Sequence, residues 1–336
     1  MERILIVHQN WLGDALFSTP ALRALKKKFP NSRISCLVPE RCRPALRRNP
    51  HADEIIVTND KIKLYSIFEV IRTVRELRKR RFDAAFFFHR SKSKALLALL
   101  AGIPRRIGYA APFRKSFLTA ACPEPREESH RVDFFLRLLE ASGIPSDGRQ
   151  LDFNPDPAAT EELTALFKRH SVGSGEGYAV LHAGGNWDLK RWPAGYFAAW
   201  AKLFLKEYPY KIILCGTASE KTLTEQILKE TASDRVVSFC GETSLDALAL
   251  LLKNAKMLLT NDSGPMHLAA SQGTKISALF GPTSPGLTGP VADNAVVLRK
   301  DVGCKIPCYF RSCHYRVCME LLSPEEVFAG TREILR

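Results

Sequence analysis

Long apolar runs are scarce in this 336-residue sequence. The longest candidate, residues 95–101, is far shorter than the ~18–20 apolar residues that a membrane-spanning helix needs. The opening residues, MERILIV, are typical of a β-strand. They differ from a signal peptide because they have no basic leader and no small-residue cleavage site after a long apolar core. We therefore expect a cytoplasmic protein.

Several nucleotide-binding signatures are also missing. Neither half of the chain has a G-x-G-x-x-G sequence after its first predicted strand, and no Walker A sequence occurs. A standard dinucleotide-binding fold is therefore disfavoured. No recognised nucleic-acid motif occurs, and the basic residues lack interleaved aromatic residues at a stacking spacing, so a nucleic-acid-binding protein is disfavoured too.

Negative charge is scarce in the first half of the chain only. Residues 1–150 hold 29 Lys and Arg against 15 Asp and Glu, whereas residues 151–336 hold 20 of each. The first half therefore carries the whole net charge of +14. A basic half beside a neutral half indicates an anionic partner, and nucleic acid, anionic lipid and an acidic glycan all fit. A basic surface without such a partner is the alternative.

Alternating strand and helix patterns run through both halves. Apolar runs at residues 3–8, 84–88 and 276–280 predict buried strands. Residues 143–157, with three prolines, two glycines and three aspartates, predict an interdomain linker. We therefore predict an α/β protein with two doubly wound domains, residues 1–150 and 151–322, and a C-terminal helix in residues 323–336.

The most informative stretch is TNDSGPMHLAASQGTKISALFG, residues 260–281. Asp262, Ser263 and Gly264 form a polar turn after an apolar run, and Pro265 suits the first turn of a helix. A helix start offers backbone N–H groups and a partial positive charge to a phosphate, although the same residues also cap helices that bind nothing. We expect the turns at residues 182–192, 216–220 and 260–267 to converge at one crevice.

Two sets of polar residues follow predicted strands in the first half. Asp14 belongs to a loop predicted at residues 10–14, at the sheet edge where such folds bind ligands. A place in the first turn of the following helix is the alternative. A basic cluster follows the strand at 84–88, and it either binds an acceptor on that same edge or forms a solvated charged face. Its members are His89, Arg90, Lys92, Lys94, Arg105 and Arg106.

The segments NWLGDALFSTPALRAL, AGGNWDLKRWP, CGETSLDALALL and TNDSGPMHLAASQGTKISALFGPTSP together resemble glycosyltransferase family 9, in particular the ADP-heptose:lipopolysaccharide heptosyltransferases. N-W-L-G-D, K-R-W-P, C-R-P at 42–44 and R-S-K-S at 90–93 favour the heptosyltransferase II branch. The resemblance covers roughly residues 4–290 and the S-P-E-E-V sequence near the end. It implies the GT-B fold, in which two Rossmann-like domains face each other across a cleft.

The resemblance also implies a reaction and its residues. The enzyme would be an inverting transferase that moves heptose from ADP-L-glycero-D-manno-heptose, bound by the C-terminal domain, without a metal or other cofactor. Asp14 matches the family's catalytic base and Lys190 its phosphate-binding lysine. The backbone amides of Ser263 and Gly264 would form a second phosphate clamp. The other implied donor residues are Asp262 for sugar hydroxyls, Glu220 for the ribose, His267 for the phosphates, and Asn186.

The acceptor implied for the basic N-terminal domain is a phosphorylated, Kdo-bearing lipid A derivative. Arg90, Lys92, Arg105 and Arg106 are the predicted acceptor residues, and we expect peripheral contact with the anionic cytoplasmic leaflet of the inner membrane. One alternative is a family 9 transferase that uses another nucleotide sugar or another glycan. A more distant alternative is a basic nucleic-acid-binding protein without enzymatic activity.

Four cysteines stand close together near the C-terminus, in the order C-x3-C-x4-C-x4-C. They are Cys304, Cys308, Cys313 and Cys318. In a cytoplasmic chain such thiols are metal ligands or free thiols more often than disulfides. The first gap is usual for zinc and the later gaps are less typical. We therefore consider a structural zinc or iron–sulfur centre, with unligated thiols and disulfides as the alternatives.

Overall fold

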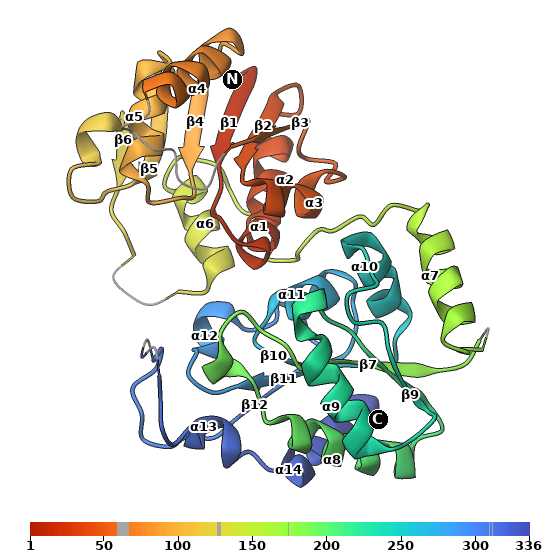
Figure 1. Cartoon of the computed structure of the whole chain (residues 1–336). Helices are drawn as coiled ribbons and strands as arrows, with labels where there is room; N and C mark the ends of the chain where they lie inside the picture. The colour runs from red at the N-terminus through yellow and green to blue at the C-terminus, as the bar shows by residue number, and fades with distance from the viewer. Residues whose placement is uncertain (59–66, 126–128, 174, 309, 311) are drawn as a thin grey trace. The chain divides into compact units, whose positions relative to one another are not determined.

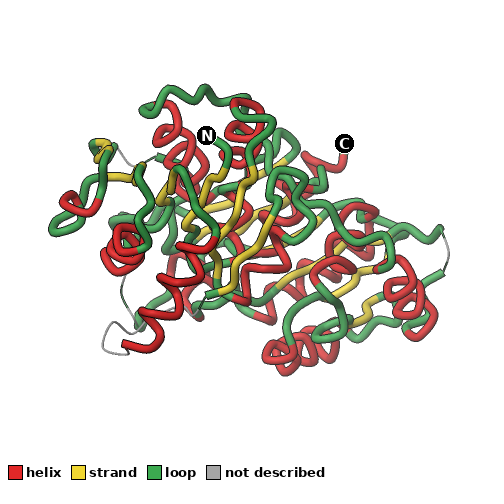
Figure 2. The backbone as a smooth tube through the Cα atoms, turned by 90° about the horizontal axis from the view of Figure 1, so that it is seen from above, coloured by secondary structure: helices red, strands yellow, loops and turns green. Residues whose placement is uncertain are grey.

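The computed structural model describes residues 1–58, 67–125, 129–173, 175–308, 310 and 312–336. Its internal contacts divide the chain into two compact units, Met1–Phe153 and Asn154–Arg336. Each unit contains one six-stranded parallel sheet with helices packed on it (Figure 1), and Figure 2 shows the strands in yellow among the red helices. The α/β fold class predicted from the sequence is confirmed.

The sheet of the first unit has the strand order β3-β2-β1-β4-β5-β6, and all neighbouring strands run parallel. The order reverses direction between β1 and β4. In a sheet of this type, ligands bind outside the carboxyl ends of the strands at that point. The strands are β1 (Arg3–Val7), β2 (Arg33–Val38), β3 (Glu54–Val57), β4 (Ala84–Phe87), β5 (Arg105–Tyr109) and β6 (Ala120–Cys122).

Helices cover the sheet of the first unit on both faces, which explains why β1 and β4 are continuous apolar runs. Side chains from α4 and α5 pack with Val7 and Phe87 in one buried cluster. The helices are α1 (Leu12–Phe17), α2 (Thr19–Lys28), α3 (Arg43–Leu46), α4 (Ile67–Lys79), α5 (Lys92–Leu100) and α6 (Arg131–Glu140), with short 3₁₀ turns at η1 (Glu40–Cys42) and η2 (Lys115–Phe117).

The segment after β1 differs from the sequence prediction. We expected a loop at residues 10–14 and then one helix, whereas α1 begins at Leu12 and is separated from α2 at Ser18. The Ser18 hydroxyl donates to the carbonyl of Ala15 at 2.7 Å and lies 3.0 Å from Nδ1 of His8. Such a local side-chain bond competes with the regular helical pattern. Asp14 therefore lies in the first turn of α1.

The sheet of the second unit has the order β12-β11-β10-β7-β8-β9, again with parallel neighbours. Counted from its own first strand, this is the same order as in the first unit, and its direction reverses between β7 and β10. The strands are β7 (Tyr178–His182), β8 (Lys211–Leu214), β9 (Val236–Ser238), β10 (Leu258–Asn261), β11 (Ile276–Phe280) and β12 (Ala295–Arg299).

Aromatic side chains fill one face of the second sheet. Trp200 and Phe204 of α8 are fully buried and stack at 4.9 Å between ring centroids, in a cluster that includes Val327 of α14. The helices are α7 (Ala159–Arg169), α8 (Ala194–Glu207), α9 (Lys221–Thr231), α10 (Leu245–Asn254), α11 (Gly264–Ser271), α12 (Pro285–Thr288), α13 (Val317–Glu320) and α14 (Pro324–Leu335), with η3 (Asp188–Lys190) and η4 (Ala218–Glu220).

One prediction extends beyond the described residues. The amphipathic pattern of residues 65–79 predicts a helix, and α4 is present from Ile67 onward. Residues 65 and 66 lie outside the described ranges. Across the ranges that the structure describes, no helix has the length and apolar character needed to cross a membrane.

Candidate active site

Three turns meet at the carboxyl ends of the central strands of the second sheet. They follow β7, β8 and β10, and they comprise residues 183–192, 215–220 and 262–264. Hydrogen bonds and ion pairs join each turn to at least one of the others, as the sequence predicted. Because β7 and β10 flank the point where the strand order reverses, these turns occupy the expected ligand position of the fold.

The buried side chain of Glu220 connects two of these turns through hydrogen bonds. One carboxylate oxygen accepts the N–H of Gly185 at 2.9 Å, and the other accepts the N–H of Thr217 at 2.7 Å and its hydroxyl at 2.9 Å. Burial by itself would raise the pKa of this carboxyl, but the nearby His182 and the Thr217 donors hold it well below its usual range. A Cβ at Gly184 would lie 1.7 Å from a Glu220 oxygen, so the position requires glycine.

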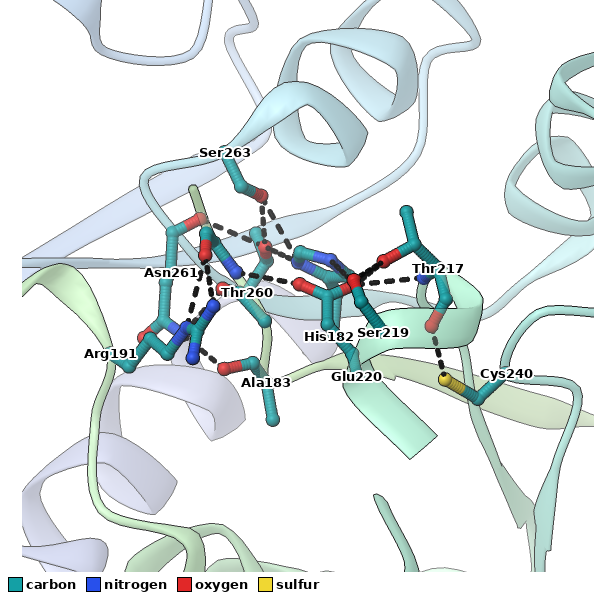
Figure 3. A network of polar contacts seen from close by, with 12 residues as sticks. His182, Ala183, Arg191, Thr217, Ser219, Glu220, Cys240, Thr260, Asn261 and Ser263 are labelled. Atoms are coloured by element: carbon teal, nitrogen blue, oxygen red, sulfur yellow. Dashed lines mark hydrogen bonds and ion pairs between the residues drawn. The ribbon is translucent and has the colours of Figure 1, made fainter. Parts of the chain in front are cut away.

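His182 connects this carboxylate to the third turn. Its Nε2 lies 3.8 Å from Glu220, while its Nδ1 lies 3.1 Å from the Ser263 hydroxyl and 3.3 Å from that of Thr260 (Figure 3). The ring is buried at the end of β7. His182 belongs to none of the motifs described above; the available signal was a polar residue in the last position of an otherwise apolar strand.

The turn at residues 262–264, where the sequence predicted a phosphate site, leads directly into α11. Ser263 is the N-cap residue, and its side chain makes no capping hydrogen bond to the helix because its hydroxyl faces His182. The first amides of a helix have no intrahelical acceptor, so this end combines free donors with the positive end of the helix dipole. His267 lies buried one turn further along α11. The geometry suits an oxyanion at Ser263 and Gly264.

Lys190 lies directly beside this turn. Its Nζ donates to Asp262 at 2.8 Å, and the Asp262 side chain is almost fully buried. The predicted phosphate lysine and the predicted sugar-binding aspartate therefore form an ion pair in this structure. Asn186, the other residue predicted on this loop, is exposed.

Two further residues fix the loop that carries Lys190, and sequence analysis missed both. Asn261 donates to the carbonyls of Ala183 and Gly184 at 2.7 and 3.0 Å and accepts the N–H of Trp192 at 3.1 Å. Arg316, from the cysteine-rich segment, donates to the carbonyls of Asp188 and Arg191 at 3.2 and 2.6 Å. These two carbonyls flank Lys190, so the cysteine-rich segment supports the candidate donor loop.

The four clustered cysteines are free thiols in this structure. Cys304 and Cys313 are exposed, and Cys308 and Cys318 are partly buried. Burial raises the pKa of the Cys318 thiol, and the other three thiols add to that rise. In the described part of the chain, no group of three or more His, Cys, Asp or Glu side chains is arranged to hold a metal ion. Metal ligation by these cysteines therefore has no supporting geometry here and stays a prediction.

Asp14 lies at the corresponding edge of the first sheet, in the first turn of α1. Burial raises the pKa of its carboxyl, and the positive charge of Arg131 opposes that rise. Nearby, Lys94 of α5 donates to Asn10 at 3.3 Å, which links the segments after β4 and β1. The first unit thus holds a partly buried carboxylate at its own ligand edge.

The predicted acceptor cations do not all gather at that edge. Arg90 and Lys92 follow β4 and lie at its carboxyl end, but Arg105 pairs with Ala84, the first residue of β4. Arg105 and Arg106 therefore lie at the amino end of the sheet, and their predicted grouping with Arg90 is wrong. The sequence prediction missed the strand β5, which begins at Arg105 and carries the chain from one edge to the other.

The two parallel six-stranded sheets, one in each unit, define a protein with the GT-B fold. The model of glycosyltransferase family 9 (heptosyltransferase) matches residues 70–316. The chain belongs to glycosyltransferase family 9 and is a glycosyltransferase.

Known members resemble the chain over nearly its whole length. Lipopolysaccharide heptosyltransferase 2 of Escherichia coli K12 is 29% identical over 313 residues, which cover 90% of this chain and 89% of that protein. The solved structure of E. coli ADP-heptose lipopolysaccharide heptosyltransferase II has a TM-score of 0.81 and 27% identity, covering 100% of this chain and 98% of that one. A family 9 transferase from Veillonella parvula has a TM-score of 0.87 and 25% identity, with coverages of 99% and 97%.

We predict that Glu220→Gln destabilises the protein by about 1–3 kcal/mol at pH 7, because an amide replaces a buried carboxylate that accepts several hydrogen bonds. The folded-state pKa of Glu220 is lowered, so its contribution is present above the ordinary value of 4.5 and decreases as pH falls below it. Thermal unfolding at pH 7 and pH 4 would measure this. The stability difference between the wild type and the Glu220→Gln protein should be smaller at pH 4 than at pH 7.

The matched control is Glu225→Gln, which removes an exposed carboxylate from α9. This variant should stay within about 0.5 kcal/mol of the wild type. Equal destabilisation by both substitutions would contradict the central role of Glu220.

Proposed function

We propose that this glycosyltransferase moves heptose from ADP-L-glycero-D-manno-heptose to a heptosyl-Kdo-lipid A type acceptor in the inner core of lipopolysaccharide. The observation that supports this most is the similarity to heptosyltransferase 2 proteins over about 90% of the chain. The family match over residues 70–316 includes the candidate donor turns. Family 9 chemistry with another nucleotide sugar or another glycan is the second candidate, because its donor turns would have the same outline.

The proposed donor site is the meeting point of the three turns in residues 154–336. The diphosphate would lie against the amides of Ser263 and Gly264 and against Lys190, which supply positive charge to the leaving group. Asp262 would then lose its hydrogen bond from Lys190 and accept hydrogen bonds from the sugar hydroxyls. Both carboxylate oxygens of Glu220 already accept hydrogen bonds from the protein, so Glu220 would make only a peripheral contact with the ribose. His267 and Asn186 complete the proposed donor set.

The proposed acceptor site is the carboxyl edge of the first sheet. Arg90 and Lys92 follow β4 there, and a phosphorylated, acidic glycolipid fits the excess of basic residues in the first half of the chain. The same charge would favour peripheral binding at the anionic cytoplasmic face of the inner membrane. Nucleic acid is not part of this proposal.

Asp14 is the proposed general base. Inversion by direct displacement needs one base to take the proton from the acceptor hydroxyl as it attacks the anomeric carbon, while the nucleoside diphosphate leaves from the opposite face. The raised pKa of Asp14 makes it a better proton acceptor than an exposed aspartate. In this proposal the protein's own donors balance the charge of the leaving group, and no metal or other cofactor takes part.

We predict that the purified protein adds one heptose to a truncated inner-core acceptor when it is supplied with ADP-heptose. Mass spectrometry of the acceptor would show the gain of a single heptose. Parallel reactions with UDP- and GDP-sugars should give no comparable product. Transfer from one of those donors and none from ADP-heptose would replace the first proposal with the second.

We predict that Asp14→Asn lowers turnover by roughly 10²–10⁴-fold, the usual contribution of a general base, while ADP affinity is unchanged. The variant should fold with undiminished thermal stability at pH 7. Because the folded-state pKa of Asp14 is raised, the wild type loses stability relative to the variant as pH rises through and above the ordinary value of 3.8. Single-turnover rates and thermal unfolding would measure the two effects.

The control for this variant is Asp133→Asn, which changes a carboxylate in the first turn of α6 that pairs with Arg149. Its turnover should remain near that of the wild type. Near-normal turnover of the Asp14→Asn protein would remove Asp14 from the mechanism.

We predict that Lys190→Gln weakens ADP binding by roughly 10–100-fold, because a charge-assisted hydrogen bond to phosphate contributes about 1.5–3 kcal/mol. Isothermal titration calorimetry would measure the change. Lys206→Gln, on the exposed side of α8, is the control and should bind ADP normally. An unchanged ADP affinity in the Lys190→Gln protein would contradict its role at the diphosphate.

A further inference from the structure

Arg114 is a buried arginine with no acidic partner among the described residues. It lies in the loop after β5, just before η2, and its side chain is fully buried. Its Nε and Nη2 atoms have no hydrogen-bond partner among the described residues. The guanidinium carbon lies 5.4 Å from the centroid of the Phe87 ring. Burying an unpaired guanidinium is costly, so the free protein holds this group at the expense of stability.

The charges around Arg114 are mostly positive. Burial and the charge of Arg90 lower its pKa to about 10, and burial together with Lys94 and Arg114 lowers the pKa of His89 to about 4. The acidic residue paired with Arg90 is Glu124, which forms a short ion pair with it. Arg90, Lys94 and Arg114 therefore converge at the carboxyl end of β4, and among the described residues Glu124 is the carboxylate that forms an ion pair with one of these three cations.

The donors in this cluster are held in defined positions. Nδ1 of His89 accepts the N–H of Ser91 at 2.9 Å, so the neutral ring carries its proton on Nε2 and can donate it. Lys94 is buried and its Nζ donates to Asn10 at 3.3 Å. Gly108 admits the guanidinium, since a Cβ at this position would lie 2.5 Å from Nη2 of Arg114. The strand order reverses beside these residues, where ligands bind in such sheets.

A neighbouring arginine shows what a purely structural role looks like in this unit. Arg106 is partly buried, and it donates from Nε to the carbonyl of Phe117 at 2.7 Å and from Nη1 to that of Ile103. Its guanidinium ties strand β5 to the adjoining loops. Arg114 follows the same strand, yet two of its three guanidinium nitrogens make no such bond.

We propose that Arg114, together with His89 and Lys94, forms a buried binding site for an oxyanion. This oxyanion would be a phosphate or carboxylate group carried by the acceptor. The planar guanidinium can donate two parallel hydrogen bonds to such a group, and the anion supplies the missing negative charge. The identity of the group as part of the acceptor rests on the proposed function. Binding of the oxyanion itself does not, and the two can fail separately.

The test compares full-length wild type with Arg114→Met by thermal unfolding in buffers without phosphate and with increasing inorganic phosphate, using acetate in a parallel series. Wild type should gain stability with one of the two anions, and the stronger response identifies phosphate or carboxylate as the bound chemistry. In Arg114→Met the apparent dissociation constant should rise at least tenfold. Without anion, this variant should unfold at the same temperature as wild type or higher, because the uncompensated charge is gone.

Two controls distinguish anion binding at Arg114 from anion binding elsewhere on the protein. Lys115→Met removes an exposed cation from the next position and should keep the wild-type response. The Lys190→Gln background, which impairs the proposed donor site, should keep it as well. If Arg114→Met does not fold, Arg114→Lys serves instead, because it keeps the charge without the planar fork and should also bind the anion more weakly.

Two results would overturn the proposal. One is an Arg114→Met protein that unfolds at a lower temperature and retains the wild-type anion response, which would make Arg114 a structural residue. The other is the absence of any Arg114-dependent response to either anion. A failure to transfer heptose in the presence of a normal Arg114-dependent response would count against the proposed function alone.

Discussion

The buried carboxylate of Glu220 is the interaction on which the second unit depends most. It accepts protein donors from the turns after β7 and β8, and His182 extends its influence to Ser263 after β10. A buried charge must have its hydrogen bonds satisfied, so none of these turns can move without exposing or unpairing it. Rigid turns present the α11 amides and Lys190 in fixed positions, which is the preorganisation that charge stabilisation requires.

The first unit has the same strand order but a different charge balance at its ligand edge. There burial raises the pKa of Asp14, and two guanidinium nitrogens of Arg114 have no hydrogen-bond partner in the described part of the chain. Neutral side chains at these positions would cost the folded protein less. Groups that are unfavourable in the free protein and suited to a charged ligand are typical of sites where function limits stability. The second sheet thus carries a polar network around Glu220 whose hydrogen bonds are satisfied. The first sheet carries Asp14 and Arg114, whose charged forms are less well stabilised.

The sequence was sufficient to predict the fold class and most elements, because hydrophobic periodicity and helix boundaries are local properties. Strand β11 has the predicted bounds, residues 276–280, and α11 begins at the predicted turn. The candidate donor turns were also identifiable, since parallel strands bring their carboxyl ends to one edge.

The remaining features depend on contacts that no local pattern encodes. Arg105 and Arg106 are close to Arg90 in sequence, but strand β5 places them at the opposite edge of the sheet. The division at Ser18 depends on His8, ten residues earlier. His182, Asn261 and Arg316 act through bonds to residues between about 70 and 130 positions away, which only the folded chain brings together.

The boundary between Phe153 and Asn154 has a consequence for how such an enzyme can diversify. Every bond of the Glu220 network is made within residues 154–336, and the cation cluster around Arg114 is made within residues 1–153. Substitutions can therefore reshape one binding edge without passing through the bonds that hold the other. A substitution in one unit therefore leaves every hydrogen bond and ion pair of the other unit's cluster in place, so the two polar clusters can change in sequence independently.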